Sequence, residues 1–204
     1  MVSWDDRYSG DGFFYGTEPN DFLVGQAHRL PAGGRVLCLA EGEGRNAVWL
    51  AGRGYDVTAV DQSAVGLAKA GRLAASRGLA LHTVQADLAQ WTLPPGAWDA
   101  IVSIWCHLPG ALRAKVHRAV VAGLRPGGVF LLEAYTPDQL RYGTGGPKDV
   151  DLLPTLAQLR EELQGLQFEF AIERERDVRE GSGHTGPSAV VQVVARRLAD
   201  EASP

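Results

Sequence analysis

A glycine-rich loop and an isolated acid stand at a spacing that suits nucleoside binding. The loop Ala40–Gly44 reads A-E-G-E-G between an apolar run and a helix-like stretch, and Asp61 ends the next apolar run. Glycines let the backbone approach a ligand closely, and a helix N-terminus presents unpaired N–H groups. A carboxylate about 20 residues beyond such a loop can accept hydrogen bonds from both hydroxyls of a ribose. The pattern predicts an adenosine-binding site, and a tight turn with an exposed aspartate is the simpler structural alternative.

Two acidic residues in the loop distinguish between the adenosine cofactors. The dinucleotide fingerprint G-x-G-x-x-G would place a third glycine where this sequence has Ala47. Glu41 and Glu43 would repel a pyrophosphate, whereas they suit a cofactor that carries a sulfonium and an ammonium group. The electrostatic argument therefore favours S-adenosylmethionine over a dinucleotide.

Short apolar runs alternate with helix-like stretches through the first two thirds of the chain. The expected strands are 35–40, 55–60, 79–84, 98–104 and 129–135, and the expected helices are 46–54, 63–77 and 112–124. This alternation is typical of a parallel sheet that is covered by helices on both faces. The sequence therefore predicts an α/β fold.

The N-terminal part follows a different pattern. Residues 4–21 are rich in aromatic residues, glycine and polar residues, and we expect an ordered but irregular segment. Asn20 or Asp21 can then cap a helix that ends at the turn formed by Gly33 and Gly34.

The C-terminal third is expected to complete the sheet with a hairpin. Residues 136–153 form a long, glycine-rich loop, which is a candidate lid or substrate loop. Thr155 and Gln158 can form a capping box for the following helix. Residues 166–172 and 191–193 alternate in polarity, and a loop rather than a helix separates them, so they should pair in an antiparallel hairpin.

The overall composition excludes several classes of protein. The 204 residues are 45% hydrophobic and 22% charged, which is typical of a globular chain, and the net charge of −4 comes without an evident basic stripe for nucleic acid. The apolar runs are too short to span a bilayer, and the first residues do not resemble a signal peptide. Cys38 and Cys106 are the two cysteines, which predicts a reduced cytoplasmic protein without a metal site. The sequence does not indicate an oligomeric state.

Five motifs in order resemble those of the class I S-adenosylmethionine-dependent methyltransferases. The first, Val36–Asn46, reads V-L-C-L-A-E-G-E-G-R-N and resembles the family's V-L-D-L-G-C-G-x-G-R-N. The others are the ribose-binding acid in Val60–Asp61, the adenine-contacting acid in Gln85–Leu88, the fourth strand at Trp98–Ser103 and the turn Leu124–Gly128. The resemblance implies a Rossmann-like three-layer sandwich with a mostly parallel seven-stranded sheet and a C-terminal antiparallel hairpin. It covers nearly the whole chain, which we expect to be one domain made of an N-terminal lid segment and helix (1–34), a cofactor-binding core (35–135), and a substrate loop, helix and hairpin (136–197).

Three segments near the ends of the chain resemble small bacterial tellurite-resistance-type methyltransferases in particular. Trp4–Tyr8 reads W-D-D-R-Y, Tyr15–Asn20 reads Y-G-T-E-P-N, and Glu180–Gly186 matches near the C-terminus. This resemblance implies that the N-terminal segment closes over the methionine end of the cofactor.

The sequence departs from the family at two positions of the first motif. Cys38 stands where the family has an acid, and Ala40 replaces the first glycine. Glu41, three residues on, is a candidate to compensate for the missing carboxylate.

The expected site therefore has a cofactor side and an acceptor side. The residues expected to hold the cofactor are Trp4, Arg7, Tyr15, Ala40, Glu41, Gly42, Glu43, Gly44, Arg45, Asn46, Asp61, Gln62, Asp87, Leu88 and Ile104. His107, His184 and the loop around Arg141 are expected to face a small-molecule methyl acceptor, with His107 and His184 as the catalytic candidates. Arg174 and Arg176 are either inward groups for an anionic substrate or, as the preferred interpretation, partners of neighbouring acids.

Two other functions remain open at this point. A nucleotide-dependent oxidoreductase would bind NADH tightly in place of the methyl donor. A non-catalytic regulator would bind the adenosine cofactor without transferring a methyl group.

Overall fold

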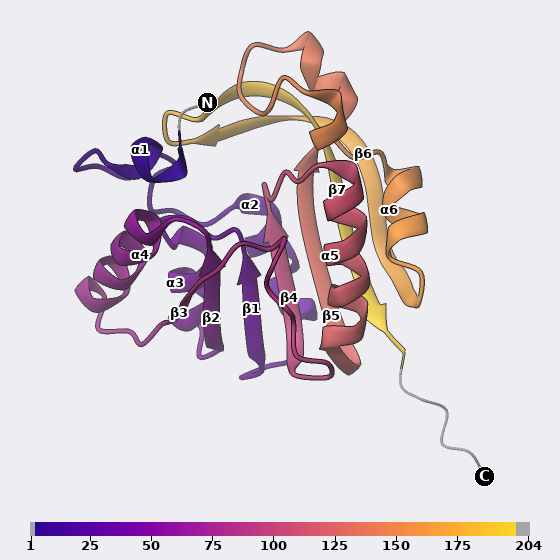
Figure 1. Ribbon diagram of the computed structural model, residues 1–204, viewed down its shortest axis with the longest axis horizontal. Coiled ribbons are helices and arrows are strands. Elements are labelled where there is room, and N and C mark those ends of the chain that lie inside the picture. The colour runs from indigo at the N-terminus through magenta and orange to yellow at the C-terminus, as the bar shows by residue number, and fades with distance from the viewer. Residues whose placement is uncertain (1–2, 199–204) are drawn as a thin grey trace.

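The chain folds around one mixed sheet of seven strands (Figure 1). The computed structural model describes residues 3–198. In sheet order the strands are β3 (His82–Gln85), β2 (Asp56–Asp61), β1 (Arg35–Leu39), β4 (Trp98–Ile104), β5 (Leu124–Tyr135), β7 (His184–Arg197) and β6 (Leu166–Glu180). The first five are parallel, and β7 runs antiparallel to both β5 and β6. The predicted fold class is confirmed.

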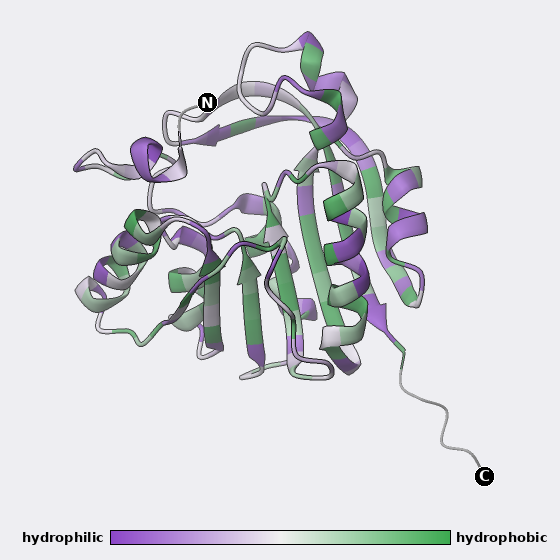
Figure 2. Cartoon of the chain, viewed as in Figure 1, coloured by the Kyte–Doolittle hydropathy of each residue, from purple (hydrophilic) through white to green (hydrophobic). Residues whose placement is uncertain are grey.

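Helices cover both faces of this sheet. They are α1 (Trp4–Tyr8), α2 (Asp21–Gln26), α3 (Arg45–Ala51), α4 (Ala64–Ser76), α5 (Gly110–Gly123) and α6 (Leu156–Glu162), with short 3-10 turns at Ala27–Arg29, Pro137–Arg141 and Val150–Leu152. Figure 2 shows that apolar residues concentrate on the central strands, whereas the outer helices have mixed faces. Within residues 3–198, each helix is too short or too polar to cross a membrane.

Alternating side chains of β1 explain the three layers. Val36 and Cys38 are fully buried in a cluster that includes residues of α2 and α3, while Leu37 and Leu39 are buried in a cluster that includes α5 and α6. Successive side chains of a strand point to opposite faces, so a strand buried on both sides must be apolar throughout. This is why the run predicted at 35–40 has no polar alternation.

The order of the strands reverses between β1 and β4, and this reversal places the site. β1 pairs with β2 on one side and with β4 on the other, all in parallel. In such sheets, ligands bind outside the carboxyl ends of the strands at the point of reversal. The loops after Leu39 and Ile104 therefore lie on the edge of the sheet that is chemically relevant.

The C-terminal hairpin is much longer than the alternation predicted. The last residue of β5, Tyr135, pairs with Val190, so residues 184–189 of β7 continue past the end of β5 and pair only with β6. His184, predicted to lie in the hairpin loop, is instead the first residue of β7, and the connection is reduced to Gly181–Gly183. In Figure 1 this extension arches over the carboxyl edge of the sheet. We call residues 174–190 the arm.

The N-terminal segment is more regular than expected. Ser3 and Asp6 form a capping box, in which Ser3 Oγ accepts a hydrogen bond from Asp6 N at 3.1 Å, and the helix α1 follows. Asn20, not Asp21, caps α2, because its side chain accepts the N–H of Leu23 at 3.0 Å. The prediction of an irregular segment over residues 4–21 was therefore wrong for α1.

Two strand starts differ from the prediction, and two predicted helix caps are present. β3 starts at His82 rather than at residue 79, and α4 keeps its predicted cap, Ser63. β5 begins at Leu124, earlier than predicted, because Leu124 pairs with Trp98 across a register shift. The capping box of Thr155 and Gln158 is present at α6.

Candidate functional site

The glycine loop and the distal acid meet at the carboxyl edge of the sheet. Asp61 ends β2, and its Oδ2 accepts the N–H of Gly42 at 2.8 Å while Oδ1 accepts the N–H of Ser63 at 2.8 Å. The loop turns back on itself through left-handed residues, with φ values of 48° at Ala40, 60° at Gly42 and 91° at Gly44. An alanine in this conformation is strained, and the motif that this loop resembles has glycine in its place. Loop and acid thus form one hydrogen-bonded unit.

The side chain of Glu41 accepts hydrogen bonds from the N-terminus of α3. Its Oε1 accepts the N–H groups of Asn46 at 2.9 Å and Ala47 at 2.8 Å, and both bonds use the same oxygen. Burial raises the pKa of this carboxyl to about 7, although the two backbone hydrogen bonds act in the opposite direction. Cys38, beneath it in β1, is fully buried. Glu41 can therefore change its charge near neutral pH.

Glu43 does not contribute a free charge to the loop. Its Oε1 lies 2.7 Å from Lys69 Nζ of α4, and its Oε2 accepts the N–H of Phe14 at 2.7 Å. Glu43 and Lys69 are both buried. The sequence predicted that both Glu41 and Glu43 could balance the positive charge of the cofactor. Because Lys69 neutralises Glu43, only Glu41 is available for this role.

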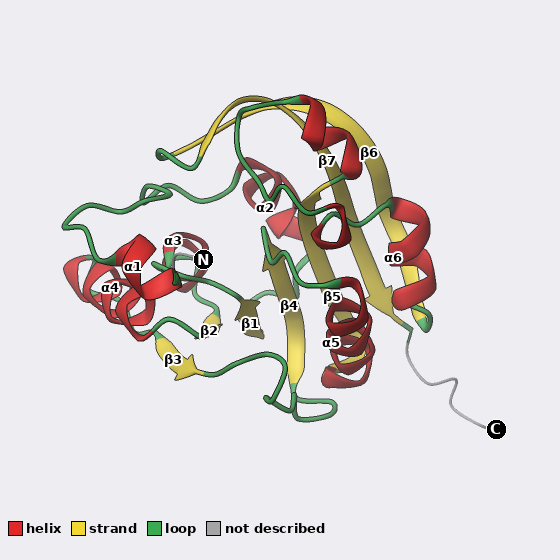
Figure 3. Ribbon diagram, turned by 45° about the horizontal axis from the view of Figure 1, so that its top comes forward, coloured by secondary structure: helices red, strands yellow, loops and turns green. Residues whose placement is uncertain are grey.

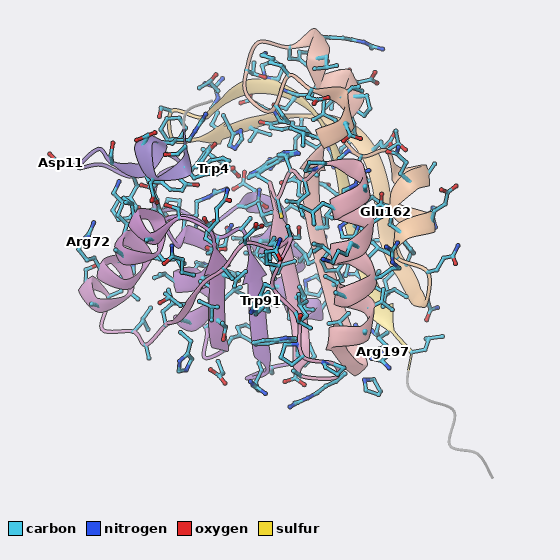
Figure 4. The ribbon with its side chains drawn as sticks, in the orientation of Figure 1. Trp4, Asp11, Arg72, Trp91, Glu162 and Arg197 are labelled. Atoms are coloured by element: carbon cyan, nitrogen blue, oxygen red, sulfur yellow. The ribbon has the colours of Figure 1, made fainter. Side chains whose placement is uncertain are left out.

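The N-terminal segment packs on this loop, as the resemblance implied. Tyr8 is buried so close to Gly42 that a Cβ there would lie 2.6 Å from its hydroxyl. Asp5 accepts a hydrogen bond from Ser63 Oγ at 2.5 Å, which joins α1 to the start of α4. Arg7 lies 5.1 Å from the ring centroids of Trp4 and Phe14. Figure 4 shows Trp4 on the side of α1 toward the middle of the molecule.

The remaining cofactor candidates lie along the same edge. Asp87 follows β3, is exposed, and its Oδ1 accepts the N–H of Ala89 at 2.8 Å. Leu88 is buried, and so is Ile104 at the end of β4, whereas Gln62 is exposed.

The tip of the arm and the N-terminal segment together form a roof over this edge. Ser182 N donates to Phe14 O at 2.9 Å, and the ring of Tyr15 stacks on His184 with centroids 4.9 Å apart. A Cβ on Gly181 would come within 2.2 Å of Phe14 O, so the contact requires glycine. Figure 3 shows the tip of the arm beside the loop that precedes α2. We call residues 12–16 and 180–184 the roof.

A buried carboxylate, Glu180, connects the roof to both sides of the site. It accepts hydrogen bonds from Arg45 at 2.6 Å, from Asn20 Nδ2 at 2.8 Å and from Trp105 Nε1 at 2.6 Å. Burial acts to raise the pKa of Glu180, but the charge of Arg45 and the hydrogen bonds outweigh it, and the pKa is lowered. Glu180 is therefore held ionised in the interior.

A second buried carboxylate, Glu133, lies next to the first. It accepts Asn20 Nδ2 at 2.6 Å, Gln192 Nε2 at 2.6 Å and two bonds from Arg176 at 2.9 and 3.0 Å. Asn20 thus bridges the two carboxylates. The interpretation of Arg176 as a partner of a neighbouring acid is confirmed, whereas Arg174 is exposed. We call Glu133, Glu180, Arg45, Arg176 and Asn20 the ionic network.

Aromatic and imidazole rings gather between the network and the sheet edge. Trp105 has a left-handed φ of 58°, and its ring stacks on Tyr135 with centroids 4.5 Å apart. His107 lies nearly parallel to Tyr135, with a centroid distance of 5.6 Å and an interplanar angle of 9°. His184 lies 4.9 Å from Trp105 and 5.4 Å from Tyr135. The two predicted acceptor-side histidines therefore belong to one cluster, although they lie 77 residues apart in the sequence.

Both histidines are fixed through one ring nitrogen only. His107 Nδ1 lies 3.1 Å from the carbonyl oxygen of Leu152, and His184 Nδ1 lies 2.6 Å from the Tyr135 hydroxyl. Among residues 3–198, the buried side-chain polar atoms without a hydrogen-bond partner are Trp98 Nε1 and the Nε2 atoms of these two histidines. Burial lowers the pKa of each to about 4, so both imidazoles are neutral at physiological pH.

The loop 136–153 is tied down rather than open. Gln139 is buried and its side chain accepts the N–H of Ala189, and Thr144 Oγ1 donates to Pro187 O. Arg141, expected on the acceptor side, is exposed and pairs with Asp138 at 2.9 Å. Nothing in this arrangement directs Arg141 toward the histidines.

A clamp behind the cluster positions the carbonyl that holds His107. Arg113 of α5 donates to Asp151 O at 3.0 Å and to Glu162 of α6 at 3.0 Å, and His117 Nδ1 lies 2.7 Å from Glu162. Figure 4 shows Glu162 where α6 faces α5. The clamp fixes the turn Val150–Leu152 against α5.

Sequence reasoning missed five residues of the site. They are Asn20 as a bridge, Trp105, Glu133, Tyr135 and Glu180. Tyr135 and Trp105 had a usable signal, since each ends or follows a strand at the carboxyl edge. Glu180 had only its place at the start of the segment Glu180–Gly186, which carries the resemblance. Glu133 had no signal, because an acid within a strand predicts exposure.

Comparisons with known proteins agree with this geometry. Residues 36–128 match the family model described as "Methyltransferase domain". The chain is 32% identical over 139 residues to a glycine/sarcosine N-methyltransferase of Halorhodospira halochloris. The aligned region covers 65% of this chain and 48% of that protein. The chain thus spans about half the length of this curated relative.

Solved structures share the fold over most of the chain. An S-adenosylmethionine-dependent methyltransferase of Methanosarcina mazei superposes with a TM-score of 0.70 at 16% identity, covering 90% of this chain and 100% of that one. TehB of Haemophilus influenzae gives a TM-score of 0.70 at 21% identity, covering 87% of this chain and 61% of that one. At these identities the likeness concerns the fold.

Replacing Glu180 should show how much the ionic network stabilises the protein. Glu180→Gln leaves Arg45 buried without its anionic partner, and we expect a loss of about 3 kcal/mol in the free energy of unfolding. Asp177→Asn is the matched control on the same strand, because its partner Arg179 is exposed, and it should cost below about 1 kcal/mol. Chemical denaturation at pH 7 measures both.

The pH dependence of this loss has a defined sign. The pKa of Glu180 is lowered on folding, so its stabilisation is present above the unfolded value of about 4.3 and disappears as the pH falls through the folded value. The difference between wild type and Glu180→Gln should therefore shrink on acidification. Equal, small losses for Glu180→Gln and Asp177→Asn at pH 7 would contradict the assignment.

Proposed function

We propose that the chain, whose residues 36–128 match a methyltransferase domain, is a class I S-adenosylmethionine-dependent methyltransferase that transfers a methyl group from S-adenosylmethionine to a small-molecule acceptor. The observation that carries the proposal is the unit formed by Asp61 and the loop Ala40–Gly44 at the switch point of the sheet. The motifs that resemble the family occur in order around that unit.

The residues of the unit fit the chemistry of this cofactor. Asp61 offers carboxylate oxygens at the end of β2, where a ribose can donate its hydroxyls. Glu41 can be ionised near neutral pH and can compensate the positive charge of the cofactor in place of the acid missing at Cys38. Asp87, with one oxygen bonded to Ala89, is available for the adenine amino group.

The other cofactor residues are assigned by their place at this edge. Trp4 and Arg7 of the N-terminal segment, together with Tyr15 of the roof, would close on the methionine end. Arg45 would act indirectly, because it is committed to Glu180. Glu43, bound by Lys69, would hold the N-terminal segment against the loop rather than contact the cofactor.

The cofactor supplies an electrophilic methyl group on a sulfonium, and the protein supplies alignment. Displacement at a methyl carbon is accelerated mainly by holding the nucleophile in line with the leaving group. The ring cluster is formed by residues that follow β4 (Trp105, His107), end β5 (Tyr135) and begin β7 (His184). It would form the acceptor side, with the two histidines as catalytic candidates. The glycine/sarcosine N-methyltransferase among the relatives acts on small amines by its name, which supports a small acceptor.

Two alternatives are less well supported. An oxidoreductase would need a loop suited to pyrophosphate, whereas position 41 is a carboxylate at the start of α3. A non-catalytic regulator would not require two buried imidazoles with unpartnered nitrogens.

Cofactor binding tests the proposal directly. Titration calorimetry should show one S-adenosylmethionine per chain, and Asp61→Asn should weaken it by about 10-fold or more, because a neutral amide loses a charge-assisted bond to ribose. Asp56→Asn is the matched control, since Asp56 begins the same strand at the opposite edge and pairs with Arg35. The proposal fails if wild type binds no S-adenosylmethionine at millimolar concentration, or if it binds NADH instead.

Glu41 gives the binding a pH dependence. Its pKa lies at about 7, and a cationic ligand favours the ionised form, so the affinity for S-adenosylmethionine should rise between pH 6 and pH 8. Each unit by which the ligand lowers the pKa corresponds to about a tenfold gain in affinity. Glu41→Gln can keep the hydrogen bonds to Asn46 and Ala47, but it should abolish this rise.

A neutral ligand is the control for this experiment. Methylthioadenosine, which has neither the sulfonium nor the amino-acid group, should bind with the same affinity at pH 6 and pH 8 and to Glu41→Gln. If Glu41→Gln binds S-adenosylmethionine as wild type does at pH 8, Glu41 does not compensate for the acid missing at Cys38.

A further inference from the structure

On the acceptor side of the site, the charged groups are all paired, but two histidine nitrogen atoms have no hydrogen-bond partner. Every charged group of the ionic network has a partner of opposite charge, because Glu133 binds Arg176 and Glu180 binds Arg45. The surfaces nearest the two histidines are aromatic rings, those of Tyr15, Trp105 and Tyr135. A ligand at this cluster would therefore meet ring faces and no unpaired charge.

Two nitrogen atoms in the cluster still need a hydrogen-bond partner. His107 Nε2 and His184 Nε2 are buried and unpartnered, and buried polar groups in native proteins nearly always have a partner. His184 is 4% exposed, and its Nδ1 is committed to the Tyr135 hydroxyl at 2.6 Å. The His184 ring is therefore held in one orientation, and its Nε2 atom is available for a hydrogen bond with a bound ligand.

From this geometry we infer, on the premise of the proposed function, that the acceptor is a neutral aryl compound with an O–H or S–H group, and that His184 Nε2 takes its proton. The ring of the acceptor would stack on the half-buried rings of Tyr15 and Trp105, because Tyr135 is fully buried. Its O–H or S–H would donate to Nε2 and satisfy the orphaned nitrogen. An anion would find no unpaired cation here, since Arg176 and Arg45 are already bound.

The step balances in atoms and charge. The lone pair of the acceptor oxygen or sulfur forms a bond to the methyl carbon, the carbon–sulfur bond of the donor breaks, and the proton passes to His184 Nε2. The positive charge thereby moves from sulfur to the imidazole. Glu180 Oε2 lies 4.0 Å from Nε2, so a carboxylate is in place to stabilise the imidazolium that forms.

A weakly basic imidazole is sufficient for this step. Burial lowers the pKa of His184 to about 4, so the ring is neutral in the physiological range. In the tautomer whose Nδ1–H donates to the Tyr135 hydroxyl oxygen, Nε2 carries the free lone pair that accepts the proton. The O–H or S–H becomes strongly acidic once its lone pair is committed to carbon, so the transfer does not need a strong base. Besides burial, the groups that act on the charge of His184 are Glu180, Arg45, His107 and Arg176. Tyr15, Trp105 and Tyr135 contact its ring.

The pH profile of turnover distinguishes this mechanism from attack by a pre-ionised acceptor. The probes are 4-methylphenol and phenylmethanethiol as neutral acceptors, and 4-hydroxybenzoate as the matched anion, at saturating S-adenosylmethionine. Wild type should methylate a neutral probe at a rate that varies less than about threefold between pH 6 and pH 9, and 4-hydroxybenzoate at least about tenfold more slowly.

His184→Asn should change both the rate and its pH dependence. Asparagine can keep a bond to Tyr135 but lacks Nε2, so turnover of 4-methylphenol at pH 7 should fall about 100-fold or more. The residual rate should rise about tenfold per pH unit, because only the ionised phenol, whose pKa is near 10, can then react. The affinity of His184→Asn for S-adenosylmethionine is measured in parallel, because His184 belongs to the roof and stacks on Tyr15, and the rates are compared at saturating cofactor.

A readout that does not depend on turnover accompanies these rates. Nitrogen NMR of the histidine rings, in the complex with S-adenosylhomocysteine, should show His184 neutral at pH 7 and a shift of its Nε2 on addition of 4-methylphenol. The same addition to His184→Asn should bind at least about tenfold more weakly by calorimetry.

Each contrary result has a separate meaning. Three results would overturn the inference and leave the proposed function intact. The first is an enzyme that binds S-adenosylmethionine but methylates neither neutral probe. The others are faster turnover of the anion than of the neutral probes, and a wild-type rate with 4-methylphenol that rises tenfold per pH unit. The wild-type profile decides even if His184→Asn does not fold. Absence of S-adenosylmethionine binding would overturn the proposed function and the inference together.

Discussion

Two carboxylates buried between the sheet and the arm constrain the rest of the site. Glu133 and Glu180 are joined by Asn20, and each is neutralised by one arginine. An ion in the interior is costly unless it is paired and fully hydrogen-bonded, so the positions of their partners cannot vary independently. Because Arg45 begins α3 and Asn20 caps α2, the network fixes the cofactor loop, the N-terminal segment and the arm relative to one another.

This constraint shapes the chemistry of the acceptor side. Since the acids and arginines satisfy one another, the rings of Trp105, Tyr135 and Tyr15 face the histidines without a free charge. Glu180 holds Trp105 through its Nε1, at a residue whose left-handed φ of 58° is costly for a side chain of this size. The same carboxylate lies near His184 Nε2, so one group both builds the cluster and can stabilise charge that appears there.

The sequence predicted the parallel part of the fold because its signals are local. Apolar runs such as 35–40 and caps such as Ser63 depend on neighbours in the chain, and the order of motifs located Asp61 and the loop Ala40–Gly44. The arm could not be predicted from periodicity, because seven of the eight residues from Glu173 to Glu180 are charged. Their inward members, Arg176 and Glu180, are satisfied by partners at distant positions, and no local pattern reports a buried ion pair. The role of Glu43 was hidden for the same reason, since Lys69 lies 26 residues away.

The central claim is that the adenosine cofactor binds at the carboxyl edge, beneath the roof. Hydrogen–deuterium exchange with and without S-adenosylhomocysteine tests it most directly, because the unit holds the amides of Gly42 and Ser63 and the roof holds that of Ser182. We expect slower exchange in 40–46, 61–63, 12–16 and 180–184 on binding. Two results would contradict this claim. One is the absence of protection in 40–46 and 61–63, and the other is protection confined to the hollow at the opposite edge, which is lined by Val24, Trp49 and Arg53.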